Sequence, residues 1–162
     1  MTEMKERQTI ERKGVEMKGI VVGIDGSEGA KHALEWAAAE AKVRSAPLTV
    51  LLAWQWPTGF YPGASGAGIT PELIDDLKKL AEQRLEEACT AVAPALDGLK
   101  VNRTVVEGVP AQALLEAADD ADLLVVGTRG HGGFVGLLLG SVSQQCAHHS
   151  PCPIVIVPPS ES

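Results

Sequence analysis

Short apolar runs without polar alternation constrain the fold of this chain more than any other feature of its sequence. Residues 19–24, 48–53, 123–126 and 154–157 are such runs, rich in Val, Ile and Leu. A run of this length between turn residues is typical of a strand buried on both faces, as in parallel sheets. The stretch 101–107 alternates more, so we expect a strand nearer a sheet edge.

Helical patterns separate these runs. The first helix follows Ser27, the second Thr70, the third Pro110, and the fourth begins near Ser141. Ser27 and Thr70 have the hydroxyl that an N-cap requires. Strands that alternate with helices favour right-handed crossovers. We therefore predict an α/β fold with a single doubly wound five-stranded parallel sheet, strand order 3-2-1-4-5, and helices on both faces.

The second helix carries apolar residues at helical spacing. We interpret this side of the helix as core and not as a cofactor groove, and we expect the segment 94–98 to end the helix. The apolar residues are Leu73, Leu77, Leu80, Ala81, Leu85, Ala88 and Val92.

Composition limits the partners of the chain. Its 162 residues, 45% of them hydrophobic, suffice for one domain with a core. The net charge of -7 argues against nucleic acid or an anionic membrane as the main partner. No apolar run approaches the roughly 20 residues of a membrane span. Three cysteines, an odd number outside any metal-ligand spacing, favour a reducing cytoplasm.

The predicted domain covers residues 19–158. Residues 1–18 are polar and patternless, and we predict a disordered N-terminal extension; the alternative is an over-long start with Met17 as the natural beginning. Residues 159–162 form a C-terminal tail.

A glycine-rich stretch at residues 127–141 lies between an apolar run and a helix start. Glycines allow close approach of the backbone to a ligand, and a helix start offers unpaired N–H groups and a positive dipole end. In a doubly wound sheet, ligands bind beyond the carboxyl ends of the strands, where the strand order reverses. Asp25 and Gly127 end the two strands expected to meet there. The sequence therefore predicts a site for the phosphates of a nucleotide.

The spacing Gly127-x2-Gly130-x9-Gly140-Ser141 resembles the nucleotide motif of the ATP-binding branch of the universal stress protein family. The resemblance covers about residues 19–158 and includes three further segments. They are Val22-Gly23-Ile24-Asp25-Gly26-Ser27, Glu107-Gly108-x-Pro110 and Pro151-x-Pro153-Ile154-Val155-Ile156-Val157. It implies a Rossmann-like fold similar to adenine nucleotide alpha hydrolases, bound ATP or a related adenine nucleotide with or without Mg²⁺, and a homodimer.

The resemblance also assigns roles to residues. Asp25 would bind the ribose hydroxyls, because a carboxylate accepts from two donors at once. Trp54 would line the adenine through its backbone, and the glycines would let the loop wrap the phosphates. No catalytic residue and no metal ligand is predicted. The predicted nucleotide-binding residues are Ile24, Asp25, Gly26, Trp54, Val126, Gly127, Arg129, Gly130, Gly140, Ser141, Val142 and Ser143.

Several of these residues have a purely structural alternative. Ser141-x-x-Gln144 matches a capping box, so Ser141 could simply start a helix. Asp25 could only cap the first helix, and Arg129 and His131 could be solvated loop residues.

Other chemically active side chains are interpreted as structural. His148 and His149 are adjacent and do not have the spacing of two ligands on one helix face, so we place them on the surface. We interpret Cys146 and Cys152 as core or surface thiols and not as a redox pair.

Motifs for turnover are missing from the sequence. It has no G-x-x-x-x-G-K-[ST], no G-x-G-x-x-G after the first strand and no paired carboxylates beside the glycine loop. We therefore predict a protein that is not an enzyme, and the resemblance implies a stress-linked nucleotide sensor. The alternatives are a slow Mg²⁺-dependent ATPase or phosphotransferase using the same pocket, and an interaction module whose pocket is empty or structural.

The strand at Ile154–Val157 would be an exposed edge with apolar residues on both faces. Pairing with the same strand of a second copy would cover it with two-fold symmetry. The alternative is that the N-terminal extension or the crossovers cover it.

Overall fold

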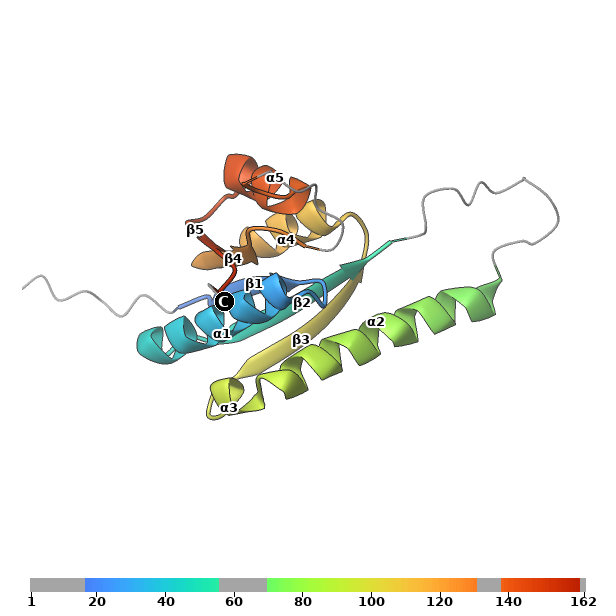
Figure 1. Ribbon diagram of the computed structural model, residues 1–162, viewed down its shortest axis with the longest axis horizontal. Helices are drawn as coiled ribbons and strands as arrows, with labels where there is room; N and C mark the ends of the chain where they lie inside the picture. Colours follow the sequence, from blue (N-terminus) through green and yellow to red (C-terminus); the bar gives the residue numbers. More distant parts are fainter. Residues whose placement is uncertain (1–16, 56–69, 131–137, 161–162) are drawn as a thin grey trace, which may run out of the picture.

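Five strands form one parallel sheet in the order β3-β2-β1-β4-β5 (Figure 1). The computed structural model describes residues 17–55, 70–130 and 138–160. The predicted fold class and strand order are confirmed. The strands are β1 (Ile20–Ile24), β2 (Leu48–Trp54), β3 (Val101–Glu107), β4 (Leu123–Gly127) and β5 (Ile154–Val157).

Helices cover both faces of the sheet (Figure 1). On one face lie α1 (Glu28–Arg44) and α2 (Pro71–Ala91), and on the other lie α4 (Pro110–Ala118) and α5 (Ser141–His149). A short helix, α3 (Ala93–Leu96), follows α2 where the sequence predicted only a helix end. Pro94 is in its first turn, where a missing N–H does no harm.

Both faces of β1 are buried. Ile20, Val22 and Ile24 pack into the core beneath α1 and α2, whereas Val21 packs into the core beneath α4 and α5. Successive side chains of a strand point to opposite faces, so a strand with a helix layer on each side needs apolar residues throughout. This explains the unbroken apolar runs of the sequence.

The predicted helix caps at Ser27 and Thr70 are confirmed. Ser27 Oγ accepts from the Ala30 N–H at 3.2 Å, and Thr70 Oγ1 accepts from the Leu73 N–H at 3.3 Å. Each bond satisfies one of the amides that have no partner within the helix.

The prediction that the whole apolar side of α2 is core was wrong for its first half. Ala81, Leu85 and Cys89 are buried, but the side chains of Leu73 and Leu80 are 36% and 43% exposed. The reason is that α2 is longer than the strands of the sheet. A helix of 21 residues is about 32 Å long, whereas the seven residues of β2 span about 23 Å. The first turns of α2 therefore extend past the sheet (Figure 1).

The N-terminal segment lies outside the described residues up to residue 16. Met17 packs against the hydrophobic core, and Lys18 Nζ lies 3.4 Å from Asp120 Oδ1 at the surface. The domain boundaries at residues 19 and 158 stay predictions. In the described ranges, no helix is both long and apolar enough to cross a membrane.

The three cysteines are free thiols, as the sequence predicted. Cys89 and Cys146 are buried, and Cys152 is half-buried. Burial raises the pKa of the Cys146 thiol to about 11, because the charged thiolate loses its hydration there. Burial also raises the pKa of Cys89. His148 and His149 are exposed, which confirms their placement on the surface.

Thiol labelling at pH 8 should therefore separate the cysteines. The thiolate is the reactive form, and Cys146 remains protonated at that pH. We expect Cys152 to react first with a disulfide reagent, and Cys89 and Cys146 to react only on unfolding. Absorbance of the released thiol, with peptide mapping, measures the order. Fast labelling of Cys146 in the native protein would contradict its burial.

Two substitutions on α2 test the division of this helix. Leu85→Ala removes a buried side chain and should lower the free energy of unfolding by about 2–5 kcal/mol. Leu80→Ala, five residues earlier on the same helix, should cost less than about 1 kcal/mol. Urea unfolding followed by circular dichroism gives both values. Equal losses would show that both halves of α2 pack into the core.

Candidate functional site

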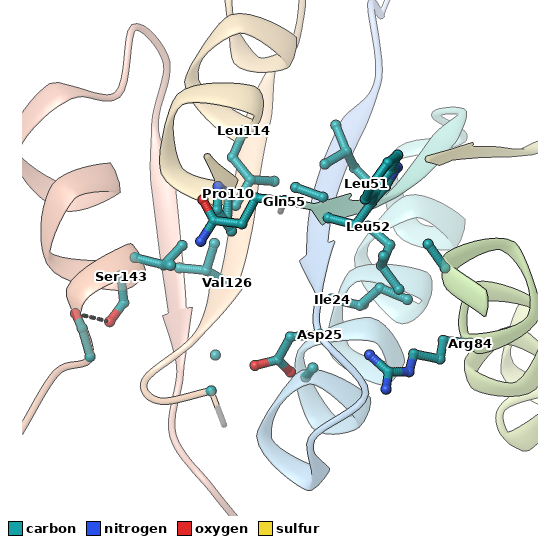
Figure 2. A pocket seen from close by; sticks show the side chains of 18 of the residues that line it. Ile24, Asp25, Leu51, Leu52, Gln55, Arg84, Pro110, Leu114, Val126 and Ser143 are labelled. Atoms are coloured by element: carbon teal, nitrogen blue, oxygen red, sulfur yellow. Dashed lines mark hydrogen bonds between the residues drawn. The ribbon is translucent and has the colours of Figure 1, made fainter. Parts of the chain in front are cut away.

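A cavity of about 480 Å³ opens at the carboxyl ends of β1 and β4, where the strand order reverses (Figure 2). Of the twelve predicted site residues, eleven line this cavity, and the twelfth, Gly26, lines an adjoining groove between α1 and α2. The eleven are Ile24, Asp25, Trp54, Val126, Gly127, Arg129, Gly130, Gly140, Ser141, Val142 and Ser143.

Asp25 directs its carboxylate into the cavity (Figure 2). Its Oδ1 accepts from the Ser27 N–H at 2.9 Å and from Ser27 Oγ at 2.6 Å. Ser27 is the residue whose side chain caps α1, so the alternative in which Asp25 itself is the cap was wrong. The two bonds fix the orientation of the carboxylate at the end of β1.

The loop after β4 lies directly against the first turn of α1. A Cβ at Gly130 would overlap Oδ2 of Asp25, and a Cβ at Gly127 would lie 3.0 Å from the carbonyl oxygen of Gly29. A Cβ at Gly29 would in turn lie 3.0 Å from the Arg129 carbonyl oxygen. Side chains rarely tolerate such distances to backbone atoms. Gly127 and Gly29 therefore allow a close backbone approach that a side chain would disturb, whereas a Cβ at Gly130 would displace the Asp25 side chain.

Gly140 has a different role. It is the N-cap of α5, with φ −76° and ψ 171°, and no side chain caps this helix. Its N–H donates to the Thr128 carbonyl at 2.7 Å and closes the loop. Ser141 is the first residue of the helix, so the alternative in which it caps the helix through a capping box was wrong. The helix start is positioned by a bond to Thr128 instead of a local serine.

Ser143 is buried and anchors the loop. Its Oγ lies 2.8 Å from the Thr128 carbonyl oxygen and 3.0 Å from that of Gly140, and the hydroxyl can donate to one of them at a time. Ser143 was predicted as a nucleotide-binding residue, but its hydroxyl is directed at the protein backbone. The first N–H groups of α5 still have no partner within the helix, and they carry the positive end of its dipole.

Trp54 ends β2 and is half-buried. Its carbonyl oxygen accepts from the Gly108 N–H at 2.8 Å, which joins the end of β2 to the turn after β3. Apolar side chains surround this end of the cavity. They are Ile24, Leu51, Leu52, Leu77, Leu80 and Leu114.

Helix α2 contributes residues that the sequence interpretation missed. Leu77, Leu80, Ala81 and Arg84 line the cavity, so this part of the helix is a wall of the site, although Ala81 also belongs to the core. The signal was available in the length of the helix pattern, which exceeds that of the strands. Gly29 was also missed, because nothing in its own neighbourhood indicates the contact with residue 129.

The charged side chains that line the cavity within the described residues are Asp25, Arg84 and Arg129. Arg129 is exposed. His131, the other candidate charge, lies outside the described residues. No group of three or more His, Cys, Asp or Glu side chains that could hold a metal ion occurs in the part of the chain that the structure describes.

Comparisons with known proteins agree on one family. The family model described as "Universal stress protein family" matches residues 16–158. A universal stress protein of Thermus aquaticus is 38% identical over 143 residues, which cover 86% of this chain and 98% of that protein. A universal stress protein of Mycolicibacterium smegmatis is 32% identical over 147 residues. The chain spans 47% of the length of that protein, about half, although 86% of the chain is matched.

Solved structures show the same architecture. A universal stress protein in complex with cAMP is 31% identical, with a TM-score of 0.65, and the match covers 88% of this chain and 97% of that one. A universal stress protein from Lactobacillus plantarum has a TM-score of 0.64 at 22% identity, with coverage of 86% and 96%. The second likeness concerns the fold alone.

A pair of glycine substitutions tests the packing of the loop. Gly130→Ala should displace the Asp25 carboxylate, because the new Cβ would overlap Oδ2. The Ser27 amide, which donates to Asp25, should then shift in a ¹H–¹⁵N spectrum. Gly140→Ala is the control, since its Cβ would meet no atom closer than 3.5 Å and its φ suits alanine. A Ser27 resonance that is unchanged in Gly130→Ala would contradict the contact.

Proposed function

The chain belongs to the universal stress protein family, and from this premise we propose that it binds ATP or a related adenine nucleotide and acts as a nucleotide-dependent sensor or regulator in a stress response. The observation that carries the proposal is the arrangement of the cavity. A fixed carboxylate, Asp25, lies across it from the start of α5, near Ser143 (Figure 2).

The Asp25 side of the cavity and the side at the start of α5 match the two ends of a nucleotide. The carboxylate of Asp25 can accept from ribose hydroxyls, whereas the N–H groups and dipole at Ser141 and Val142 attract phosphate. We therefore place the adenosine toward Asp25 and the phosphates toward Gly140 and Ser141. If Mg²⁺ is bound, its partners would be mainly phosphate oxygens and water, as is usual for this ion.

The size and lining of the cavity support a small ligand with an apolar part. Its volume of about 480 Å³ lies within the roughly 300–1,000 Å³ of small-molecule sites. The apolar side chains around Ile24 and Leu52 suit the adenine base. The 31% identical universal stress protein solved in complex with cAMP supports an adenine nucleotide at this site.

The residues that line the cavity favour binding of the nucleotide over its hydrolysis. Asp25 is the only carboxylate among the described residues that line the cavity, and it accepts two bonds from Ser27. A hydrolase needs a group that orients or activates the attacking water near the phosphates. We therefore propose a protein without robust enzymatic activity.

We also propose a cytoplasmic homodimer. The sheet ends at β5, whose residues Ile154, Val155 and Ile156 are only half-buried. Pairing of this edge with a second copy would bury them. The three free thiols suit a reducing compartment.

The central test is nucleotide binding by a matched pair of variants. Asp25→Ala should weaken ATP binding at least about tenfold in calorimetric titration, because it removes a charged acceptor. Asp76→Ala is the control, since Asp76 is an exposed aspartate on α2 that does not line the cavity. Nucleotide released by heating the purified protein should be identified by mass spectrometry. A wild-type protein that carries no nucleotide and binds no ATP would favour the interaction module.

Incubation with labelled ATP and Mg²⁺ separates sensor from enzyme. We expect no multiple turnovers. Steady hydrolysis that Ser141→Ala abolishes would establish the alternative, a slow ATPase or phosphotransferase using the same cavity.

A further inference from the structure

Arg84 occupies a distinctive place on the wall that α2 contributes to the site. It lines both the main cavity and the adjoining groove between α1 and α2, together with Ile24, Asp25 and Ala30. Its guanidinium extends from α2 toward Asp25 (Figure 2). Arg84 therefore lies where the two hollows meet, on the α2 side of Asp25 (Figure 2).

The donors of Arg84 are uncommitted within the described residues. Arg44 pairs with Glu40 at 2.6 Å, and Arg103 pairs with Glu86 at 3.0 Å, but Arg84 makes no hydrogen bond or ion pair there. Much of its surroundings on α2 is apolar, namely Leu77, Leu80, Ala81 and Ala88. A guanidinium in this position can donate to a ligand without breaking an existing bond.

The chemistry of Asp25 and Arg84, which line the same hollows, selects a ligand group that can bind both. A carboxylate only accepts hydrogen bonds, and a guanidinium only donates them. A group that bridges them must donate on one side and accept on the other, which a hydroxyl does. An ether, ester or phosphate oxygen could accept from Arg84 but could not also donate to Asp25.

We propose that Arg84 is a specificity-determining residue that binds the ribose of the nucleotide. It donates to the oxygen of a ribose hydroxyl, and the same hydroxyl donates its proton to Asp25. This inference rests on the proposed function and extends it in two ways. It makes α2 a third side of the nucleotide site beside the β1 end and the β4–α5 loop, and it predicts a preference for ribonucleotides over deoxyribonucleotides.

A different role for Arg84 would give a different result. Its charge could attract the phosphates without any contact with the ribose. In that case every nucleoside triphosphate would lose affinity equally when the charge is removed. Contact with a hydroxyl predicts a loss that depends on whether the ligand has that hydroxyl.

The experiment measures binding of ATP, 2′-deoxy-ATP and 3′-deoxy-ATP to four full-length proteins by calorimetric titration. They are the wild type, Arg84→Gln, Arg84→Lys and Lys78→Gln. Lys78→Gln is the matched control, because Lys78 is an exposed cation on α2 that lines neither hollow. Glutamine keeps good helix propensity at the exposed position 84, so we expect both Gln variants to fold as the wild type does.

The expected pattern is specific. Arg84→Gln should weaken ATP binding roughly three- to tenfold, but it should change the affinity for one of the two deoxy analogues by less than about twofold. Arg84→Lys should recover only part of the loss, because lysine lacks the planar fork. Lys78→Gln should bind all three ligands as the wild type does.

Three results would overturn the proposal. They are an unchanged ATP affinity in Arg84→Gln, an equal loss for all three triphosphates, and a wild type that binds ATP and both deoxy analogues alike. Failure of the proposed function is distinguishable from these, because the wild type would then bind none of the three ligands.

Discussion

The first turn of α1 lies in direct backbone contact with the loop that follows β4, and the geometry of the site depends on this contact. Gly29 and Gly127 approach so closely that a Cβ on Gly127 would lie 3.0 Å from the Gly29 carbonyl oxygen. The same approach brings Gly130 against the carboxylate of Asp25. Two segments about a hundred residues apart in the chain thereby form one edge of the cavity, and larger side chains at these positions would separate them.

The two described ends of this loop are joined by hydrogen bonds to a single residue, Thr128. The Thr128 carbonyl oxygen accepts from the Gly140 N–H and lies within hydrogen-bond distance of Ser143 Oγ, while the Thr128 N–H donates to the Val157 carbonyl at 3.1 Å. Thr128 thus ties the end of β4 to the start of α5 and to the end of β5. A helix start fixed in this way presents its amides without first having to be ordered, which reduces the entropic cost of binding an anion.

Features encoded by neighbouring residues could be predicted from the sequence. The strands, their order and the caps at Ser27 and Thr70 depend on local patterns or on general rules of parallel sheets. The start of α5 near Ser141 was predicted as well, but the way it is capped was not. Ser141 and Gln144 have the spacing of a capping box, but the long-range bonds to Thr128 place Gly140 at the cap. A local pattern was overridden by tertiary contacts.

The residues that sequence reasoning missed share this long-range origin. Gly29 lies against the Arg129 carbonyl, and Arg84 lines the cavity from α2, a helix remote in sequence from Asp25 and Gly127. Apolar spacing identifies the side of a helix that faces inward, but not whether core or cavity lies opposite each turn. To tell core from cavity, one must also know how far the sheet extends beneath the helix.

The overhang of α2 has a consequence for how this site can work. The walls formed by β1, β4 and α5 are joined by backbone contacts and by buried bonds such as that of Ser143. On the wall from α2, the side chains of Leu80 and Arg84 are exposed, although Ala81 and Leu85 beside them are buried. Segments with few buried apolar contacts are the ones that open and close at low free-energy cost. The first turns of α2, which extend past the sheet, are therefore the part of this wall that can move without disturbing the core.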